Sequence, residues 1–324
     1  SYTAGNSIYA GYIATEYYPA APLLVNLGVR YEISKQWVDY YTDGGKAERS
    51  ELNKNDLFPS LNMKYQMNEK NSLRFAFSRT VTRPSFIEMA PFLYQESYGS
   101  TQIRGNADLQ NGYNYNIDLR YELFEKNGDM LSITAYYKHL KAPIERVQTL
   151  SGGSAVHSFR NADNGMATGV EIEFRKEIVK DLRFGVNGSY MYTNVKLPEG
   201  GAYTNSQRAL QGASPYLANA DLTYSPAFSN DRQLSVALLY NLQGPRIHSV
   251  GISGLGDIKQ QPVHTLNFTG SYRFNRRFAV KLQVNDLLNQ DILFKQEVPT
   301  TGDKVEVERF RKGTGFEVGF SYDL

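Results

Sequence analysis

The stretch Tyr113-Asn114-Tyr115-Asn116-Ile117-Asp118-Leu119-Arg120-Tyr121-Glu122-Leu123 alternates strictly between two kinds of side chain. Aromatic and aliphatic residues take the odd positions, and amide or charged residues take the even ones. A period of two is the repeat of a β-strand, whose successive side chains point to opposite faces of a sheet. The stretch from Phe316 to Leu324 repeats the pattern, so both predict strands with one apolar and one polar face.

Thirteen segments of the chain share this alternation. They are residues 8–18, 23–33, 61–65, 73–77, 113–123, 131–137, 170–174, 182–192, 216–224, 234–240, 266–274, 278–284 and 316–324. Several have the roughly 9 to 11 residues that a tilted strand needs to cross a bilayer. The composition agrees, because 24 Tyr and 17 Phe occur in a chain whose mean hydropathy is only -0.46. Such a balance is typical of strands that meet lipid on one face and carry aromatic rings at the two interfaces.

The connections between these segments alternate in length. Short links lie at 18–22, 66–71, 125–129, 176–181, 226–232 and 275–277, and longer ones lie between them at 35–57, 80–112, 142–159, 196–211, 246–262 and 295–304. An outer-membrane barrel has short periplasmic turns on one side and long extracellular loops on the other, whereas a soluble sandwich has no reason to alternate. The sequence therefore predicts an all-β chain that forms a transmembrane, antiparallel, up-and-down β-barrel.

The odd number of segments bears on the extent of the chain. Bacterial single-chain barrels generally have an even number of strands. We therefore expect residues 1–324 to be the C-terminal part of a barrel of about 22 strands, the class whose lumen is plugged. The plug domain and the first strands would then lie outside this chain, and no further boundary divides it.

Several other classes of protein are excluded or disfavoured. No apolar run approaches 18 residues, so a transmembrane helix is excluded, and the absence of Cys excludes disulfides and thiolate sites. A net charge of +2 without a basic block argues against nucleic acid as a partner. The four His residues are dispersed, and the glycines at 251–256 do not form a phosphate-binding motif. We therefore predict no catalytic residue, no metal site and no cofactor, and hence no enzyme.

The inward charges have a simpler interpretation than catalysis. Alternation places carboxylates and guanidinium groups on the same face, namely Asp118, Glu122, Glu171 and Glu173 with Arg120, Arg175, Arg183 and Arg273. Paired carboxylates can act as general acid and base. Mutual ion pairing, together with contact to a polar plug, is the better-supported account of these charges, because the guanidinium groups share the face of the carboxylates.

A series of short motifs runs through the chain in a recognisable order. They are residues 26–32 (NLGVRYE), 59–65 (PSLNMKY), 73–75 (LRF), 78–86 (SRTVTRPSF), 105–109 (GNADL), 136–138 (YYK), 169–173 (GVEIE), 211–216 (QGASPY) and 285–289 (NDLLN). In this order they resemble the TonB-dependent receptors of Bacteroidetes, in the outer-membrane β-barrel branch. Ala107 replaces a usual Pro, and Leu324 ends the chain where many such proteins end in Phe.

The resemblance implies a multi-pass protein of the bacterial outer membrane that takes up a nutrient with energy from the TonB complex. It also implies partners: the N-terminal part with its plug domain, the TonB complex, outer-membrane lipid and, as a further candidate, a surface lipoprotein. Two other readings stay open, a structural or adhesive barrel without transport and, third, an outer-membrane enzyme. The substrate is open among glycans, siderophores, cobalamin and peptides.

Aromatic residues in the long links are the candidate substrate-binding residues. They are Trp37, Tyr40, Tyr41, Tyr94, Tyr98 and Tyr203. Rings on extracellular loops can stack on sugars or organic ligands, or they can simply fold the loop. Acidic loop residues, including Asp39, Asp43, Glu48 and Asp257, could hold calcium, but no EF-hand spacing is present.

Overall fold

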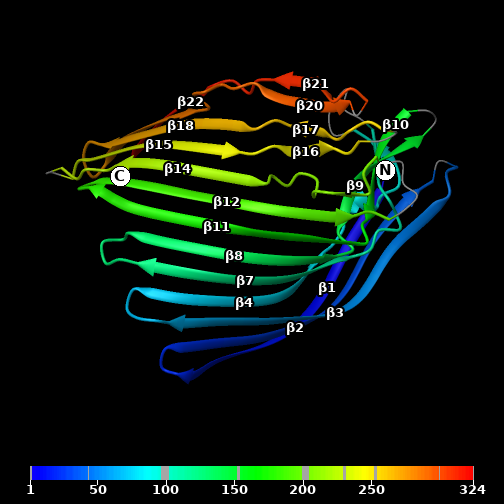
Figure 1. Cartoon of the computed structure of the whole chain (residues 1–324), viewed down its shortest axis with the longest axis horizontal. Helices are drawn as coiled ribbons and strands as arrows, with labels where there is room; N and C mark the ends of the chain where they lie inside the picture. The colour runs from blue at the N-terminus through cyan, green and yellow to red at the C-terminus, as the bar shows by residue number, and fades with distance from the viewer. Residues whose placement is uncertain are drawn as a thin grey trace.

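A single curved sheet dominates the computed structural model, which describes residues 2–42, 44–95, 102–151, 154–198, 204–228, 231–251, 254–298 and 300–323. Thirteen antiparallel strands follow one another along it in chain order (Figure 1). They are β1 (Tyr2–Ala20), β2 (Leu23–Tyr41), β3 (Ala47–Gln66), β4 (Asn71–Thr82), β7 (Gly112–Phe124), β8 (Met130–Lys141), β11 (Asn164–Val179), β12 (Leu182–Lys196), β14 (Tyr216–Tyr224), β15 (Gln233–Gln243), β18 (Val263–Arg273), β19 (Phe278–Asn285) and β22 (Gly315–Tyr322). The predicted all-β, up-and-down architecture and the count of thirteen strands are confirmed.

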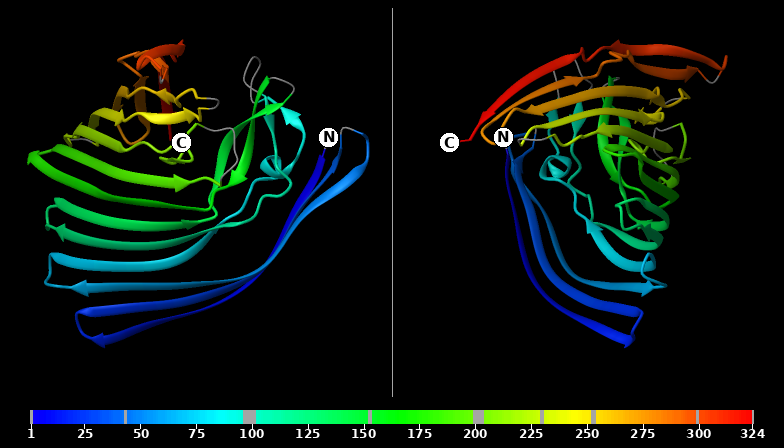
Figure 2. Two further views of the ribbon diagram at one scale, coloured as in Figure 1. Left: turned by 45° about the vertical axis from the view of Figure 1, so that its right-hand side comes forward. Right: turned by 90° about the vertical axis from the view of Figure 1, so that its left-hand side faces the viewer.

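The sheet forms a deep trough with two free edges. Within the described residues, β1 and β22 each pair with one neighbour only, and Figures 1 and 2 show the curvature between them. Tight turns gather at the end of the trough where the C-terminus lies, and the longer connections gather at the opposite end, beside the N-terminus. We call these the short-turn end and the long-loop end. A barrel of about 22 strands remains a prediction.

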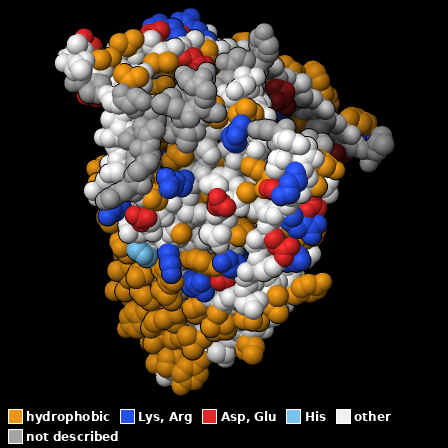
Figure 3. Space-filling view, turned by 90° about the vertical axis from the view of Figure 1, so that its right-hand side faces the viewer, with side chains coloured by type: hydrophobic (Ala, Val, Ile, Leu, Met, Phe, Trp, Pro, Cys, Tyr) orange, Lys and Arg blue, Asp and Glu red, His pale blue; other side chains and the backbone are white. Residues whose placement is uncertain are grey.

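Register gives the sheet one apolar and one polar face. Directly paired residues point to the same side, so Ile133 and Ile172, which pair between β8 and β11, share the convex face and are 40% and 49% exposed. Apolar side chains cover this outer surface, whereas charged ones gather over the long-loop end (Figure 3). Ser132 and Glu173 pair one residue further along and share the concave face. The two faces predicted from the alternation are confirmed.

Ion pairs line part of the concave face. Glu122 accepts from Arg74 at 2.8 Å and lies 2.9 Å from Arg120, while Arg175 lies 2.7 Å from Glu173. Mutual pairing of the inward charges, as expected for Arg120 and Arg175, is therefore confirmed.

The long links are more regular than the sequence indicates. They contain β5 (Leu93–Tyr94), β6 (Ile103–Arg104), β9 (Ile144–Ser151), β10 (Ser154–Asn161), β13 (Gln207–Arg208), β16 (Arg246–Ser249), β17 (Ile258–Gln260), β20 (Ile292–Val298), β21 (Asp303–Phe310) and the one-turn helix α1 (Phe86–Met89). The predicted link 35–57 is wrong, because β2 and β3 run on as a paired hairpin from Leu23↔Tyr65 to Tyr41↔Ala47. The alternation continues there with polar side chains on both faces, which an apolar pattern does not reveal.

Small cores fix the long-loop end. One consists of Val38, Leu52, Met89 and Ala90, and two others join β6 to β10 and β9 to β12. α1 packs so closely on the backbone at Gly105 that a Cβ there would lie 2.2 Å from the Ala90 carbonyl oxygen. No helix in the described part of the chain is long and apolar enough to span a membrane.

Candidate functional site

The β2–β3 hairpin marks where the apolar band ends. Leu27 and Ile33 on the outer face of β2 are each 49% exposed, but two residues further on Lys35 forms an ion pair with Glu51 at 3.2 Å. Residues 23–33 span about 33 Å at about 3.3 Å per residue, which a tilt of about 45° reduces to roughly 23 Å. That height matches the apolar band of an outer-membrane barrel, about 25 Å. The hairpin therefore projects beyond the band at the long-loop end.

The connection between β4 and β7 folds back onto the concave face of this hairpin. Gln36 Nε2 donates to the Pro84 carbonyl at 2.6 Å, and Ser50 Oγ donates to the Ala107 carbonyl at 2.7 Å. Ser85 caps α1 in a reciprocal capping box, which fixes the entry of this connection. The connection between β4 and β7 therefore covers part of the concave face of the sheet. We call this connection the ledge.

Aromatic rings gather beside this ledge. The ring centroids of Tyr2 and Phe92 are 5.4 Å apart, and those of Phe92 and Tyr94 are 6.1 Å apart. Tyr40 pairs with Tyr2 across β1 and β2 and packs, like Phe92, on the core around Val38. Four rings from three segments therefore share the concave side of the long-loop end.

The predicted substrate-binding residues divide between the two faces. Tyr40 and Tyr94 belong to the aromatic group on the concave side. Trp37 lies on the convex face against Gly5, and Tyr41, which is 65% exposed, shares that face by alternation. Tyr98 and Tyr203 lie outside the described residues. The structure therefore brings two of the six together and adds Tyr2 and Phe92, which the sequence analysis did not single out.

A buried ion pair joins the connection between β8 and β11 to the connection between β12 and β14. Arg208 of β13 lies 2.9 Å from Glu145 of β9, and the two side chains are only 3% and 6% exposed. Burial raises the pKa of Glu145, and the charge of Arg208 opposes that rise. Glu145 lies in the predicted link 142–159 and Arg208 in the predicted link 196–211, and only their long-range pairing identifies them.

His157 forms the second link between loops. Arg146 Nε donates to its Nδ1 at 3.0 Å, and its Nε2 lies 3.1 Å from Ser249 Oγ in β16. Because Nδ1 accepts, the proton of the neutral ring is on Nε2, which donates to Ser249. The ring therefore cannot accept the proton of Ser249, as a general base for a serine nucleophile must. Burial, reinforced by Arg146 and by the nearby His248, lowers the pKa of His157 to about 4.

Several hollows open at the long-loop end, and two of them bear on ligand binding. The larger, of about 610 Å³, lies where β14 stops short of the outer part of β12 and is lined by Tyr190, Tyr192, Arg246, Asp257 and Lys259 among others. The second, of about 470 Å³, is lined by residues of β1, β2 and β3, including Tyr2, Tyr40 and Tyr41. Both combine rings with charged groups, which suits organic ligands that carry charge.

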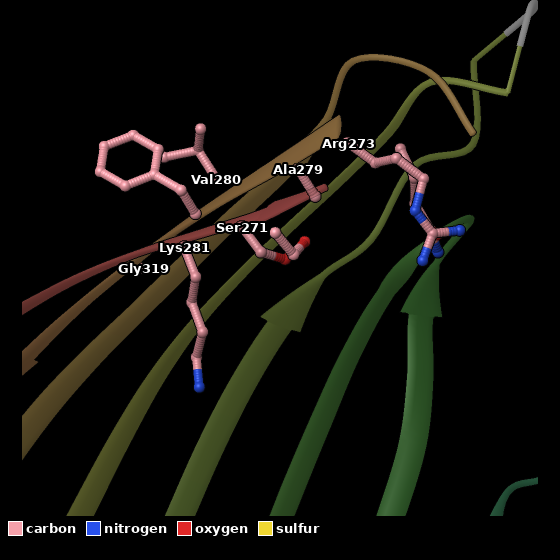
Figure 4. A pocket seen from close by; sticks show the side chains of 9 residues that line it. Ser271, Arg273, Ala279, Val280, Lys281 and Gly319 are labelled. Atoms are coloured by element: carbon pink, nitrogen blue, oxygen red, sulfur yellow. The ribbon is translucent and has the colours of Figure 1, made fainter. Parts of the chain in front are cut away.

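A further hollow lies at the short-turn end, near the free edge of β22. Figure 4 shows Arg273 and Lys281 directed to the same side of the sheet, where Ser271 also lies. Arg273 and Lys281 form no ion pair within the described part of the chain, in contrast to Arg120 and Arg175 further along the wall. This hollow is a cationic part of the concave face.

The described ranges contain no group of three or more His, Asp or Glu side chains that could hold a metal ion. His157 and His248 nevertheless lie close together, although they are 91 positions apart in the sequence. The prediction that the four His residues are dispersed is therefore wrong for this pair.

Comparison with protein families gives a match over almost the whole chain. Residues 2–322 match the model of the outer membrane protein beta-barrel family. The chain belongs to this family. Membership places it among proteins of the bacterial outer membrane, in agreement with the apolar convex face.

Relatives of this family member are longer than the chain. It is 21% identical over 270 residues to the ferric enterobactin receptor of Pseudomonas aeruginosa. The matched region covers 77% of this chain but only 35% of that receptor. The solved ferric yersiniabactin uptake receptor FyuA of Yersinia pestis superposes with a TM-score of 0.70 at 14% identity, over 100% of this chain and 46% of the receptor. The copper transporter OprC gives the same TM-score and identity over 98% and 48%. The chain thus spans about a third of the curated relative and about half of these structures.

These relatives define the fold of the family member. Its sheet matches the barrel domain of TonB-dependent receptors, as the ordered motifs indicate. The relatives are a receptor, an uptake receptor and a transporter, and such proteins are not enzymes. Assignment to the Bacteroidetes branch remains a prediction.

Proposed function

We propose that the chain is the C-terminal part of the barrel wall of an outer-membrane receptor, and that the complete protein imports a small ligand with energy from the TonB complex. The observation that carries the proposal is the division of faces, with an apolar convex band about one membrane thick and a polar concave face. Ion pairs on the concave face suit an enclosed aqueous interior that a polar plug domain fills. That domain is the first partner we propose for this chain.

We propose that the concave aromatic group forms part of the ligand entrance. The group consists of Tyr2, Tyr40, Phe92 and Tyr94. The long-loop end would face the cell exterior, because outer-membrane barrels carry their longer loops there. The first ligands to test are ferric enterobactin, ferric yersiniabactin and copper, after which the relatives are named.

Orientation can be tested with single cysteines, because the chain has no Cys of its own. Where the rest of the complete protein is also free of reactive thiols, Lys46→Cys in the β2–β3 turn should react with a membrane-impermeant maleimide on intact cells. Asn127→Cys in the β7–β8 turn should react only after the outer membrane is opened. Labelling of both, or of the second alone, on intact cells would contradict the proposed orientation.

Uptake needs its own assay. A strain that lacks the gene and one that carries it would be compared for accumulation of the three labelled ligands, with and without a protonophore. Accumulation that requires the gene and stops with the protonophore supports the proposal. If a folded, membrane-inserted protein makes no difference for any of the three, a structural or adhesive barrel becomes the better account.

The concave rings offer a matched comparison. Replacing both Tyr40 and Tyr94 by Ala should lower uptake, whereas replacing Tyr41, which is 65% exposed on the other face of β2, should not.

A further inference from the structure

The outer face of β8, β11 and β12 is organised in rows by register. Asn164 of β11 pairs directly with Lys141 of β8 and with Lys196 of β12. Directly paired residues lie about 5 Å apart and point to the same side of the sheet. The two lysines therefore flank one asparagine in a row across three strands, and all three residues are exposed. We call this set the lysine row.

The rows below it approach the lipid band in order. Met166 pairs with His139, and Thr168 pairs with both Tyr137 and Tyr192, which are 42% and 53% exposed. Below these rings the same face carries apolar residues, beginning with Val170 between Ala135 and Tyr190 and continuing with Ile172 and Phe174. This succession of apolar rows, ring row and lysine row is that of a membrane interface.

The height of the lysine row suits a lipid headgroup. Lys141 follows Tyr137 by four residues, which is about 13 Å along the strand and about 9 Å along the membrane normal at a tilt of about 45°. The headgroup region of a bilayer extends roughly 5 to 8 Å beyond the hydrocarbon on each side. Since a lysine side chain can bend toward that region while its stem lies on apolar surface, both ammonium groups can reach it.

The described residues of the sheet provide no carboxylate partner for the two lysines of the lysine row. Within the residues that the structure describes, neither Lys141 nor Lys196 forms an ion pair. Other lysines at the same end do: Lys35 lies 3.2 Å from Glu51, and Lys46 lies 3.0 Å from Glu48. The lysine row therefore keeps two positive charges for an anion outside the protein.

We propose that Lys141, Asn164 and Lys196 bind the phosphate group of a phosphorylated glycolipid in the outer leaflet. Two ammonium groups would contact the phosphate oxygens, the Asn164 amide would donate between them, and Tyr137 and Tyr192 would lie against the sugar and the start of the acyl chains. The proposal rests on the orientation proposed above but not on uptake.

The test uses the complete protein, purified in a non-ionic detergent and titrated with lipid A by native mass spectrometry. Lysine near an anionic membrane surface contributes about a factor of five in binding, so K141Q/K196Q should bind phosphorylated lipid A roughly 25-fold more weakly. The matched control is K35Q/K46Q, which removes two lysines of the same end that already have carboxylate partners. Both proteins should keep the heat-modifiable mobility of a folded barrel.

Four outcomes would overturn the proposal. Three of them are unchanged binding by K141Q/K196Q, an equal loss in K35Q/K46Q, and equally tight binding of dephosphorylated lipid A. Inorganic phosphate that competes at equal concentration would also overturn it, because the site would then hold any anion. Uptake by K141Q/K196Q is expected to be unchanged, so a failure here is distinguishable from a failure of the receptor proposal.

Discussion

The Trp37 ring lies directly over Gly5 on the outer face of the β1–β2 pair. A Cβ on Gly5 would lie 2.2 Å from Trp37 Cζ2, a distance that no packed carbon can occupy. A cross-strand aromatic ring often covers a glycine in this way, because the glycine leaves room and the ring shields the exposed backbone. Trp37 thus has a local structural role in the hairpin, which accounts for its presence without a ligand.

Replacing Gly5 by Val should displace this ring. Overpacking of this kind costs about 1 to 3 kcal/mol, and here it should appear mainly as loosening of the β1–β2 pairing. Trp37 is the single Trp of the chain, so a fluorescence shift to longer wavelength that disappears in a Trp37→Phe background would measure it. Gly11→Val is the matched control, because nothing lies within 4 Å of a Cβ at that position. Equal shifts in both variants would contradict the assigned contact.

The buried pair of Glu145 and Arg208 gives a second prediction. Glu145→Ala leaves Arg208, which is 3% exposed, as an uncompensated buried charge, and such losses cost about 3 to 5 kcal/mol. We expect faster hydrogen exchange in residues 144–161 with the barrel still folded. Glu48→Ala is the control, since its partner Lys46 is 77% exposed and an exposed pair contributes at most about 1 kcal/mol. Similar exchange in the two variants would count against the buried pair.

The strands could be predicted because their signal is local. The side chains of a lipid-facing strand alternate with a period of two residues, so segments such as 113–123 and 316–324 can be recognised from the sequence alone. The alternating lengths of the connections then predict the up-and-down topology. The same rule, applied further along β2, would have placed Tyr40 inward with Val38 and Tyr41 outward. The predicted link 35–57 misses this arrangement, because the side chains become polar there while the alternation persists.

The loop contacts could not be predicted for a different reason. His157 and Ser249 are 92 positions apart, and Glu145 and Arg208 are 63 apart, on strands that do not adjoin in the main sheet. Single residues of common type, separated this far, have no periodic signature. Their contacts depend on how three long loops pack together, which only the three-dimensional structure gives.

His157 gives a prediction of pH dependence. Its pKa in the folded loops is about 4, whereas an exposed His titrates near 6.5. The unfolded loops therefore take up a proton first, and stability is lost as the pH falls from about 6.5 toward 4. The difference between these two pKa values corresponds to roughly 3.4 kcal/mol at most. The contact to Ser249 in β16 should therefore weaken in mildly acidic solution.

Hydrogen exchange measures this effect. After correction for intrinsic rates, residues 144–161 and 246–249 should lose protection between pH 7 and pH 4.5. His157→Gln should remove most of that pH dependence, because the titrating group is gone, whereas His139→Gln on the outer face should leave it unchanged. A pH dependence that survives in His157→Gln would show that other groups control the loops.

The last prediction tests which face meets lipid. Ile172 lies on the convex face of β11, and a lysine near the middle of the bilayer costs about 2 to 4 kcal/mol in barrels of this kind. Ser189 of β12 lies on the concave face directly opposite Glu171, so a lysine there faces water and a carboxylate. We expect Ile172→Lys to lower the urea concentration at which the folded gel band disappears from vesicles, and Ser189→Lys to change it little. The reverse order would mean that the apolar face is turned inward, and every assignment built on the two faces would fail with it.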